Sequence, residues 1–201
     1  MRLNAIDTDL LKIISTAVKE MSEGELLQIE KAKKLDINVD TYFKIIKKKT
    51  ASLISSCCAL GASSVNATKD EIRLISEFGE LIGIAFQIKD DLLDYECNNT
   101  KIGKPKLKDF KEGKITLPLF YALQSNAGKR NFLLSKLGKK ISKKDEREVS
   151  KYILSGESLL VTKKTMHGYI SLAAKNIARL KTHPSYDEML ELLEFIQGRE
   201  K

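Results

Sequence analysis

The stretch FGELIGIAFQIKDDLLDY, residues 78–95, decides how this chain folds, because its apolar helical pattern ends in three carboxylates. On an α-helix Asp90 and Asp94 lie one turn apart, about 6 Å along the axis, with Asp91 beside them. The apolar side chains around them favour burial: Leu81, Ile82, Ile84, Ala85, Phe86, Ile88, Leu92 and Leu93. Carboxylates next to a buried surface repel one another unless a cation holds them.

The three aspartates therefore predict a divalent metal, and Mg²⁺ is the natural choice. Mg²⁺ takes oxygen ligands, binds few carboxylates, and completes its shell with water and substrate phosphate oxygens. A lysine-rich stretch follows, IGKPKLKDFKEGKITLPL, residues 102–119, in which Gly103, Pro105 and Gly113 interrupt the helix. Its cations lie close in sequence to the acidic face, which suggests an anionic ligand shared with the metal: Lys104, Lys106, Lys108, Lys111 and Lys114.

Together the two stretches resemble the second aspartate-rich region of the trans-isoprenyl diphosphate synthases, most closely that of the long-chain polyprenyl synthases. The aspartates, the Gly-Lys pair, Asp109 and the Gly-Lys-x-Thr-Leu-Pro run follow the family's order and spacing. The resemblance implies a prenyltransferase that ionises an allylic diphosphate and joins it to isopentenyl diphosphate, with Asp90, Asp91 and Asp94 holding Mg²⁺. Terpene cyclases also carry aspartate-rich helices, but they do not account for the lysine-rich run.

The resemblance also implies roles for basic and polar side chains. Lys49, Lys104 and Lys114 would bind the substrate diphosphate. Lys49 would also be catalytic together with Thr50 and Gln87, whose dipoles would lie near the developing allylic cation. From the residues alone, the usual interpretation of Lys49 is a surface lysine whose side chain extends from an apolar helix to water.

A Gly-Glu-x-x-Gln run that includes Glu25 and Gln28 resembles the family helix that lines the active-site cavity. The alternative is an ordinary solvated helix face. Gly79 and Gly83 stand four residues apart, so one helix face lacks side chains and a neighbouring helix can approach closely.

Apolar periodicity predicts helices throughout the chain and no strand alternation appears. The expected helices are Leu10–Leu27 after an N-cap at Asp7 to Asp9, Thr41–Leu60, Lys69–Tyr95, Leu117–Leu123 after an N-cap at Thr116, Lys129–Leu137, Lys143–Ser155, Ser158–Leu180 and Glu188–Gln197. The expectation is one all-α domain over residues 1–201, a helical bundle of the isoprenoid synthase fold that lacks the N-terminal helices. The last third shows no motif that carries chemistry.

The sequence corresponds to the C-terminal portion of such a synthase. No counterpart of the family's first aspartate-rich motif precedes Leu10, and the family reaction holds metal between two facing carboxylate clusters. We therefore expect little turnover by this chain alone, and either a homodimer or a partner that supplies the other half. The alternative is a non-catalytic or regulatory subunit, or a remnant, that acts as a helical interaction module.

Composition narrows the partners and the location. The net charge of +8 raises nucleic acid as a partner, but the lysines are spread along the chain without a recognition motif, so none is expected. No apolar run reaches membrane-spanning length, which leaves peripheral contact through a lipid product. The 3 cysteines form no disulfide framework, and the expected location is the cytoplasm.

Overall fold

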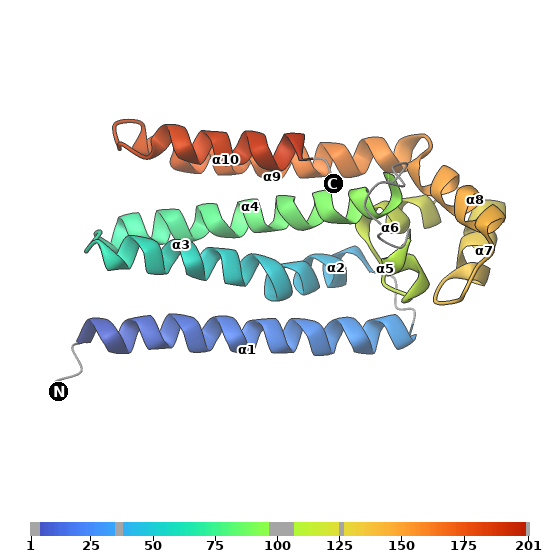
Figure 1. Cartoon of the computed structure of the whole chain (residues 1–201), viewed down its shortest axis with the longest axis horizontal. Coiled ribbons are helices and arrows are strands. Elements are labelled where there is room, and N and C mark those ends of the chain that lie inside the picture. Colours follow the sequence, from blue (N-terminus) through green and yellow to red (C-terminus); the bar gives the residue numbers. More distant parts are fainter. Residues whose placement is uncertain (1–4, 35–37, 97–106, 125–126, 200–201) are drawn as a thin grey trace.

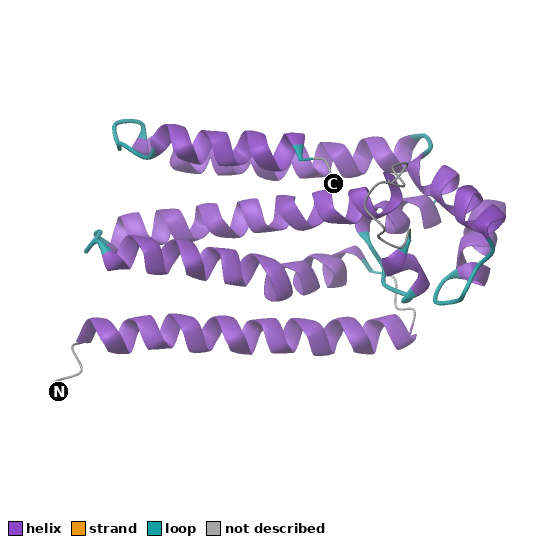
Figure 2. Ribbon diagram, viewed as in Figure 1, coloured by secondary structure: helices purple, strands orange, loops and turns teal. Residues whose placement is uncertain are grey.

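We describe residues 5–34, 38–96, 107–124 and 127–199 of a computed structural model of the chain. Within these ranges every regular element is helical, which confirms the all-α expectation. The elements are α1 (Ala5–Lys34), α2 (Val39–Ile46), the π-helix η1 (Lys47–Ala51), α3 (Ser52–Ser64), α4 (Lys69–Glu96), α5 (Lys108–Lys111), α6 (Leu117–Leu123), α7 (Ala127–Lys136), α8 (Lys143–Leu154), α9 (Glu157–Ile177), the 3₁₀ helix η3 (Ala178–Leu180) and α10 (Tyr186–Gly198). Figure 2 shows helices joined by loops, with no strand drawn.

The long helices lie side by side in layers, and α4 occupies the middle (Figure 1). On one side α4 packs against α3 and η1, which in turn contact α1. On its other side α4 packs against α9 and α10. The short helices α5 to α8 gather at one end of the bundle (Figure 1). In the part of the chain described here, no helix combines the length and hydropathy that a membrane crossing requires.

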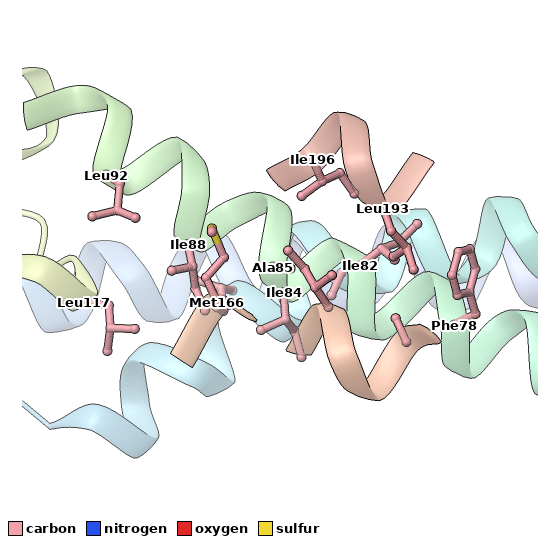
Figure 3. Close-up of a cluster of buried hydrophobic side chains, with 14 of the residues drawn as sticks. Phe78, Ile82, Ile84, Ala85, Ile88, Leu92, Leu117, Met166, Leu193 and Ile196 are labelled. Carbon is pink, nitrogen blue, oxygen red and sulfur yellow. The ribbon is translucent and has the colours of Figure 1, made fainter. Parts of the chain in front are cut away.

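Helix α4 carries the main core, as its sequence predicts. A reciprocal capping box fixes its start: the Thr68 amide donates to the Glu71 carboxylate at 2.8 Å, and the Glu71 amide donates to the Thr68 hydroxyl at 3.3 Å. Figure 3 shows its apolar face meeting side chains from α6, α9 and α10: Phe78, Ile82, Ile84, Ala85, Ile88 and Leu92 with Leu117, Met166, Leu193 and Ile196. The predicted bounds, Lys69–Tyr95, differ from the observed helix by one residue.

A second core lies at the end of the bundle formed by α5 to α8. It surrounds Phe110, Leu133 and Val149, each of which is fully buried. Helix α6 begins after Thr116 as predicted, but the Thr116 hydroxyl hydrogen-bonds the Tyr95 hydroxyl at 2.7 Å instead of capping the helix. This contact fastens the α6 end of the second core to the last turn of α4.

Glycines bring α4 close to its neighbour, which confirms the sequence expectation. A Cβ atom placed on Gly79 would lie 2.8 Å from the Ser55 Cα atom, and one on Gly83 would lie 2.6 Å from the Ala51 Cα atom. Carbon atoms cannot approach this closely without displacement, so only glycine allows the observed distance between the helices.

The helix boundaries differ from the sequence expectation most at α1, whose expected end is Leu27 and whose observed end is Lys34, and at the helix that follows it. Helix α1 begins at Ala5, before the expected cap at Asp7 to Asp9. The single helix expected over 41–60 extends from Val39 to Ser64 and contains the π-helical turn η1. Apolar periodicity does not reveal a π turn, because the pattern stays helical on both sides of one inserted residue.

Candidate active site

A pocket of about 250 Å³ lies between α1, α2, η1 and α4, next to the segment that joins α5 to α6. Polar and charged side chains make up much of its lining: Gln28, Lys31, Asn38, Thr41, Tyr42, Lys49, Thr50, Gln87, Asp90, Asp91, Asp109, Lys114 and Thr116. Of the residues expected to form the site, Lys49, Thr50, Gln87, Asp90, Asp91 and Lys114 come together here. Lys104 lies outside the described residues.

Asp91 is the most buried carboxylate of the pocket, with 3% of its surface exposed. Its Oδ2 atom accepts a 2.8 Å hydrogen bond from the Tyr42 hydroxyl, and its Oδ1 atom accepts a 2.9 Å bond from Gln87 Nε2. Burial raises the pKa of Asp91 to about 7, although both hydrogen bonds oppose the rise. The site therefore contains a carboxylate whose charge lacks a full counterpart.

Thr50 and Gln87 form the next links of the same network. The Thr50 hydroxyl donates a 2.7 Å hydrogen bond to Gln87 Oε1, while Gln87 Nε2 donates to Asp91. Gln87 and Asp91 are four residues apart and share one face of α4. The network thereby fixes which end of the Gln87 amide faces Thr50, and it joins η1 to α4.

Lys49 reaches from η1 to α1, where the Gly-Glu-x-x-Gln run lies. Its Nζ atom is 2.5 Å from Glu25 Oε2 and donates a 2.7 Å hydrogen bond to Gln28 Oε1. The neighbouring Lys48 pairs with Glu20 and Glu23 instead. Helix α1 therefore holds the two lysines at separate places, and of these two only Lys49 lines the pocket.

Lys114 brings a second cation to the pocket from the segment after α5. Its Nζ atom lies 3.0 Å from Asp109 Oδ1 and 2.6 Å from Glu112 Oε2. Burial opposes its charge, but the bonds to Glu112 and Asp109 outweigh burial and raise the pKa of Lys114 well above its ordinary value. Lys114 therefore stays protonated at neutral pH and lines the pocket as a cation.

Asp94 was expected to hold the metal, but its carboxylate bonds to the backbone of α5. Its Oδ1 atom accepts the Lys108 amide and its Oδ2 atom accepts the Asp109 amide, both at 3.2 Å. It is not among the residues that line the pocket. Asp94 anchors the first turn of α5, and through α5 it positions Asp109 at the pocket.

Asp90 is the accessible carboxylate, with its side chain 46% exposed. Its Oδ1 atom lies 3.4 Å from Nη2 of Arg199, just after α10. The Arg199 guanidinium also stacks on the Phe86 ring at 4.5 Å from the centroid. The end of α10 therefore contacts α4 at the carboxylate that is most open to a ligand.

The described residues include no cluster of three or more His, Cys, Asp or Glu side chains already arranged around one metal position. The pocket nevertheless suits Mg²⁺. Asp90, Asp91 and Asp109 line it together, and Mg²⁺ needs one or two carboxylates when water and phosphate supply its other ligands. A divalent cation there would also supply the charge that the buried Asp91 carboxylate lacks.

Sequence reasoning missed three side chains at this site. Tyr42 is one of them, and the available signal was that a buried tyrosine hydroxyl needs a hydrogen-bond partner. Asp109 was noted only for its spacing. Arg199 gave no signal, because its contact with Asp90 depends on how α10 docks on α4.

A family model described as polyprenyl synthetase matches residues 1–154 of the 201. The chain belongs to the polyprenyl synthetase family. A geranylgeranyl diphosphate synthase of Saccharolobus solfataricus is 32% identical over 169 residues, which cover 84% of this chain and 51% of that protein. Heptaprenyl diphosphate synthase component 2 of Bacillus subtilis is 37% identical over 123 residues, covering 61% of this chain and 35% of that protein.

Solved structures of polyprenyl synthases have the same fold. The Caulobacter crescentus polyprenyl synthase, crystallised with calcium and isoprenyl diphosphate, superposes with a TM-score of 0.89 at 29% identity, covering 96% of this chain and 60% of that one. A decaprenyl diphosphate synthase of Rhodobacter capsulatus superposes with a TM-score of 0.85 at 29% identity, covering 96% and 61%. The chain spans about half the length of the curated relatives it matches.

Proposed function

We propose that the chain belongs to a prenyltransferase that extends an allylic diphosphate with isopentenyl diphosphate to make a polyprenyl diphosphate. One observation carries the proposal: a single pocket is lined both by the carboxylates Asp90 and Asp91 of α4 and by the cations Lys49 and Lys114. Cations and metal-binding oxygens in one pocket suit a diphosphate bound together with a metal ion. The names of the relatives agree with this chemistry.

Different side chains of the pocket would hold the diphosphate and the metal. Lys49 and Lys114, with Lys104 from the preceding loop, would bind the diphosphate. Asp90 and Asp91 would hold Mg²⁺, with Asp94 acting through α5. When bound, Mg²⁺ would act as a Lewis acid that neutralises the departing diphosphate.

Thr50 and Gln87 would stabilise the allylic cation. Because the Thr50 proton is donated to Gln87, the lone pairs of the Thr50 oxygen are left for the pocket that Thr50 lines. Fixed dipoles aimed at charge that develops in the transition state are typically worth a hundredfold or more in rate. The hydrogen bond to Asp91 holds Gln87 in place and lowers the cost of orienting these dipoles.

Metal and substrate binding is the direct test. Isothermal titration of the chain with farnesyl diphosphate should show binding in Mg²⁺ and much weaker binding in EDTA. Asp90→Asn should reduce the affinity by about tenfold or more, since a metal ligand is lost. Asp70→Asn, the same change near the start of α4, is the matched control and should leave the affinity unaltered. Equal affinities for the two variants would show that the acidic face is ordinary surface.

Turnover is a separate question from binding. Labelled isopentenyl diphosphate, farnesyl diphosphate and Mg²⁺ should be incubated with the chain, and extractable lipid should be counted. Product would show that the chain is active by itself. Binding without product would indicate that a second chain completes the site.

A second copy or a partner chain is also part of the proposal. Helix α1 exposes apolar side chains on its outer face: Leu11, Ile14, Val18, Leu26 and Ile29. Exposed apolar surface of this kind favours association, and one relative is named as a component of its synthase. A non-catalytic role would appear as a change in the rate or product length of a full-length synthase when this chain is added.

A further inference from the structure

We infer that Gly24 and Gly83 are positioning residues. Each allows a neighbouring helix to pack closely against one side of the π turn η1, so that Lys49 and Thr50 reach the pocket together. The inference rests on the proposed function in one respect, since it assigns the pocket to diphosphate binding. It goes further by naming residues that touch no ligand and still determine the shape of the site.

Gly83 brings α4 into close contact with η1. A Cβ atom at Gly83 would lie 2.6 Å from the Ala51 Cα atom and 3.0 Å from its Cβ atom. Ala51 is itself fully buried, so η1 cannot move aside on this flank without disturbing the core. The backbone of α4 and the last residue of the π turn are therefore in direct contact.

Gly24 brings α1 into close contact with η1. A Cβ atom at Gly24 would lie 2.8 Å from the Lys49 backbone nitrogen and 3.0 Å from the Lys48 Cβ atom. This contact lies between the two ion-paired lysines, whose partners on α1 flank Gly24 in sequence. The close approach keeps Lys49 within reach of Glu25 and Gln28.

The π turn corrects the register between two fixed contacts. Tyr42 meets Asp91 at one end and Ala51 meets Gly83 at the other. Ala51 lies nine positions after Tyr42, whereas Asp91 lies eight positions after Gly83. A π-helical turn accommodates one additional residue in a helix, and η1 supplies that residue between the two contacts.

As a consequence, two adjacent residues of η1 bond to different helices. Lys49 bonds to α1 and Thr50 bonds to Gln87 on α4, yet both line the pocket. If η1 relaxed to a regular α-helix, each residue on one side of it would rotate by about 100° relative to the other side. Either Lys49 or Thr50 would then lose its partner.

Gly79 provides a matched control for packing alone. It stands one turn from Gly83 on α4, and a Cβ atom there would lie 2.8 Å from the Ser55 Cα atom of α3. Gly79→Ala therefore introduces a similar overlap, but with α3 and not with η1. Gly61→Ala, where no atom lies within 4 Å of the added Cβ, controls for the alanine itself.

The experiment compares Gly83→Ala and Gly24→Ala with the two controls by two readouts. Hydrogen exchange of the backbone amides of residues 49–52 should accelerate by about tenfold or more in the η1 variants. In the Gly79 variant it should accelerate no more than the amides of α3 as a whole. Affinity for inorganic pyrophosphate with Mg²⁺ should fall by about tenfold or more in the η1 variants, and stay within about twofold in the controls.

Unchanged exchange at residues 49–52 in both η1 variants would overturn the inference, as would equal affinity loss in Gly79→Ala and Gly83→Ala. If the parent chain binds no pyrophosphate, the proposed function fails, whereas the exchange readout still decides the inference. If Gly83→Ala does not fold, Gly24→Ala probes the same turn from α1.

Discussion

The Tyr42 hydroxyl donates a 2.8 Å hydrogen bond to Oδ2 of Asp91, a residue 49 positions further along the chain. Both side chains are buried, so the bond joins α2 to α4 inside the protein. It stabilises the ionised form of Asp91, but burial has the larger effect and the pKa of Asp91 remains raised, at about 7. Metal-free protein near neutral pH therefore contains both protonation states of this carboxyl group.

This raised pKa predicts a pH dependence of folding. The pKa of Asp91 is about 7 in the folded chain and near its ordinary value of 3.8 when unfolded. Between these values the folded chain binds a proton that the unfolded chain does not, so stability falls as pH rises from about 4 to about 7. The slope from this group is at most about 1.4 kcal/mol per pH unit. The variant Asp91→Asn should lack this fall of stability with pH.

Urea denaturation in EDTA at several pH values measures this effect. The free energy of unfolding of Asp91→Asn should increase relative to that of the parent as pH rises from about 4 to about 7. Asp70→Asn, an exposed site on the same helix, should track the parent. Parallel curves for the parent and Asp91→Asn would contradict a raised pKa.

Removing the phenol group tests the same contact from the other side. Tyr42→Phe takes away a hydrogen bond that lowers the pKa of Asp91, so that pKa should rise further. Carboxyl carbon chemical shifts followed through a pH titration would report it. A downward movement of the Asp91 midpoint would show that Tyr42 does not donate to Asp91 in solution.

Lys114 and Lys111 allow a charge-matched comparison for diphosphate binding. Lys114 lines the pocket, whereas Lys111 pairs with Glu146 of α8 at 2.6 Å and is not among the lining residues. Lys114→Gln should weaken Mg²⁺-dependent binding of farnesyl diphosphate by about tenfold or more, because a charge-assisted contact is lost. Lys111→Gln should change it by less than about threefold. Equal losses would mean that net charge, rather than position, determines affinity.

The sequence predicted the fold best where strong local signals determine the structure. The apolar face of α4 and the proline-led start of α6 depend on neighbours in sequence, and both helices were found at or within one residue of the expected bounds. The π turn was not predictable, because it adds the one residue needed to align the Tyr42–Asp91 contact with the Ala51–Gly83 contact. That register exists only once α2, α3 and α4 have packed.

The site divides in the same way. Lys49, Thr50 and Gln87, which the family resemblance named as site residues, line one pocket. The directions of the aspartate side chains could not be read from spacing. Helical geometry gives each a position on α4, but the amides of α5 draw Asp94 away, and the docking of α10 brings Arg199 to Asp90.

Gly168 offers a test of the helix assignment in α9. It is exposed within the helix, and no atom lies within 4 Å of an added Cβ. Gly168→Ala should therefore raise the free energy of unfolding by about 0.5–1 kcal/mol, because alanine loses less backbone entropy than glycine. Thermal or urea denaturation measures the change. A loss of stability would mean that this face of α9 is covered in solution.

Asp94 should prove a structural carboxylate, in contrast to Asp90. Each of its oxygens accepts one backbone amide at the start of α5. Asp94→Asn leaves one oxygen acceptor and turns an NH₂ group toward the other amide, so a partly buried donor is left without a partner. That should cost about 1–3 kcal/mol of stability. Asp90→Asn disturbs only a partly exposed ion pair with Arg199 and should cost less than about 1 kcal/mol.

Urea denaturation of the two variants in EDTA, with circular dichroism to follow helicity, separates the two roles. Because Asp94 holds the turn that carries Asp109, its loss should also reach the pocket, and binding of pyrophosphate with Mg²⁺ should weaken in both variants. The combination distinguishes them: reduced affinity at nearly full stability for Asp90→Asn, and reduced affinity together with reduced stability for Asp94→Asn. If Asp94→Asn kept full stability and lost only affinity, Asp94 would be a direct metal ligand in solution, and the anchoring of α5 would be secondary.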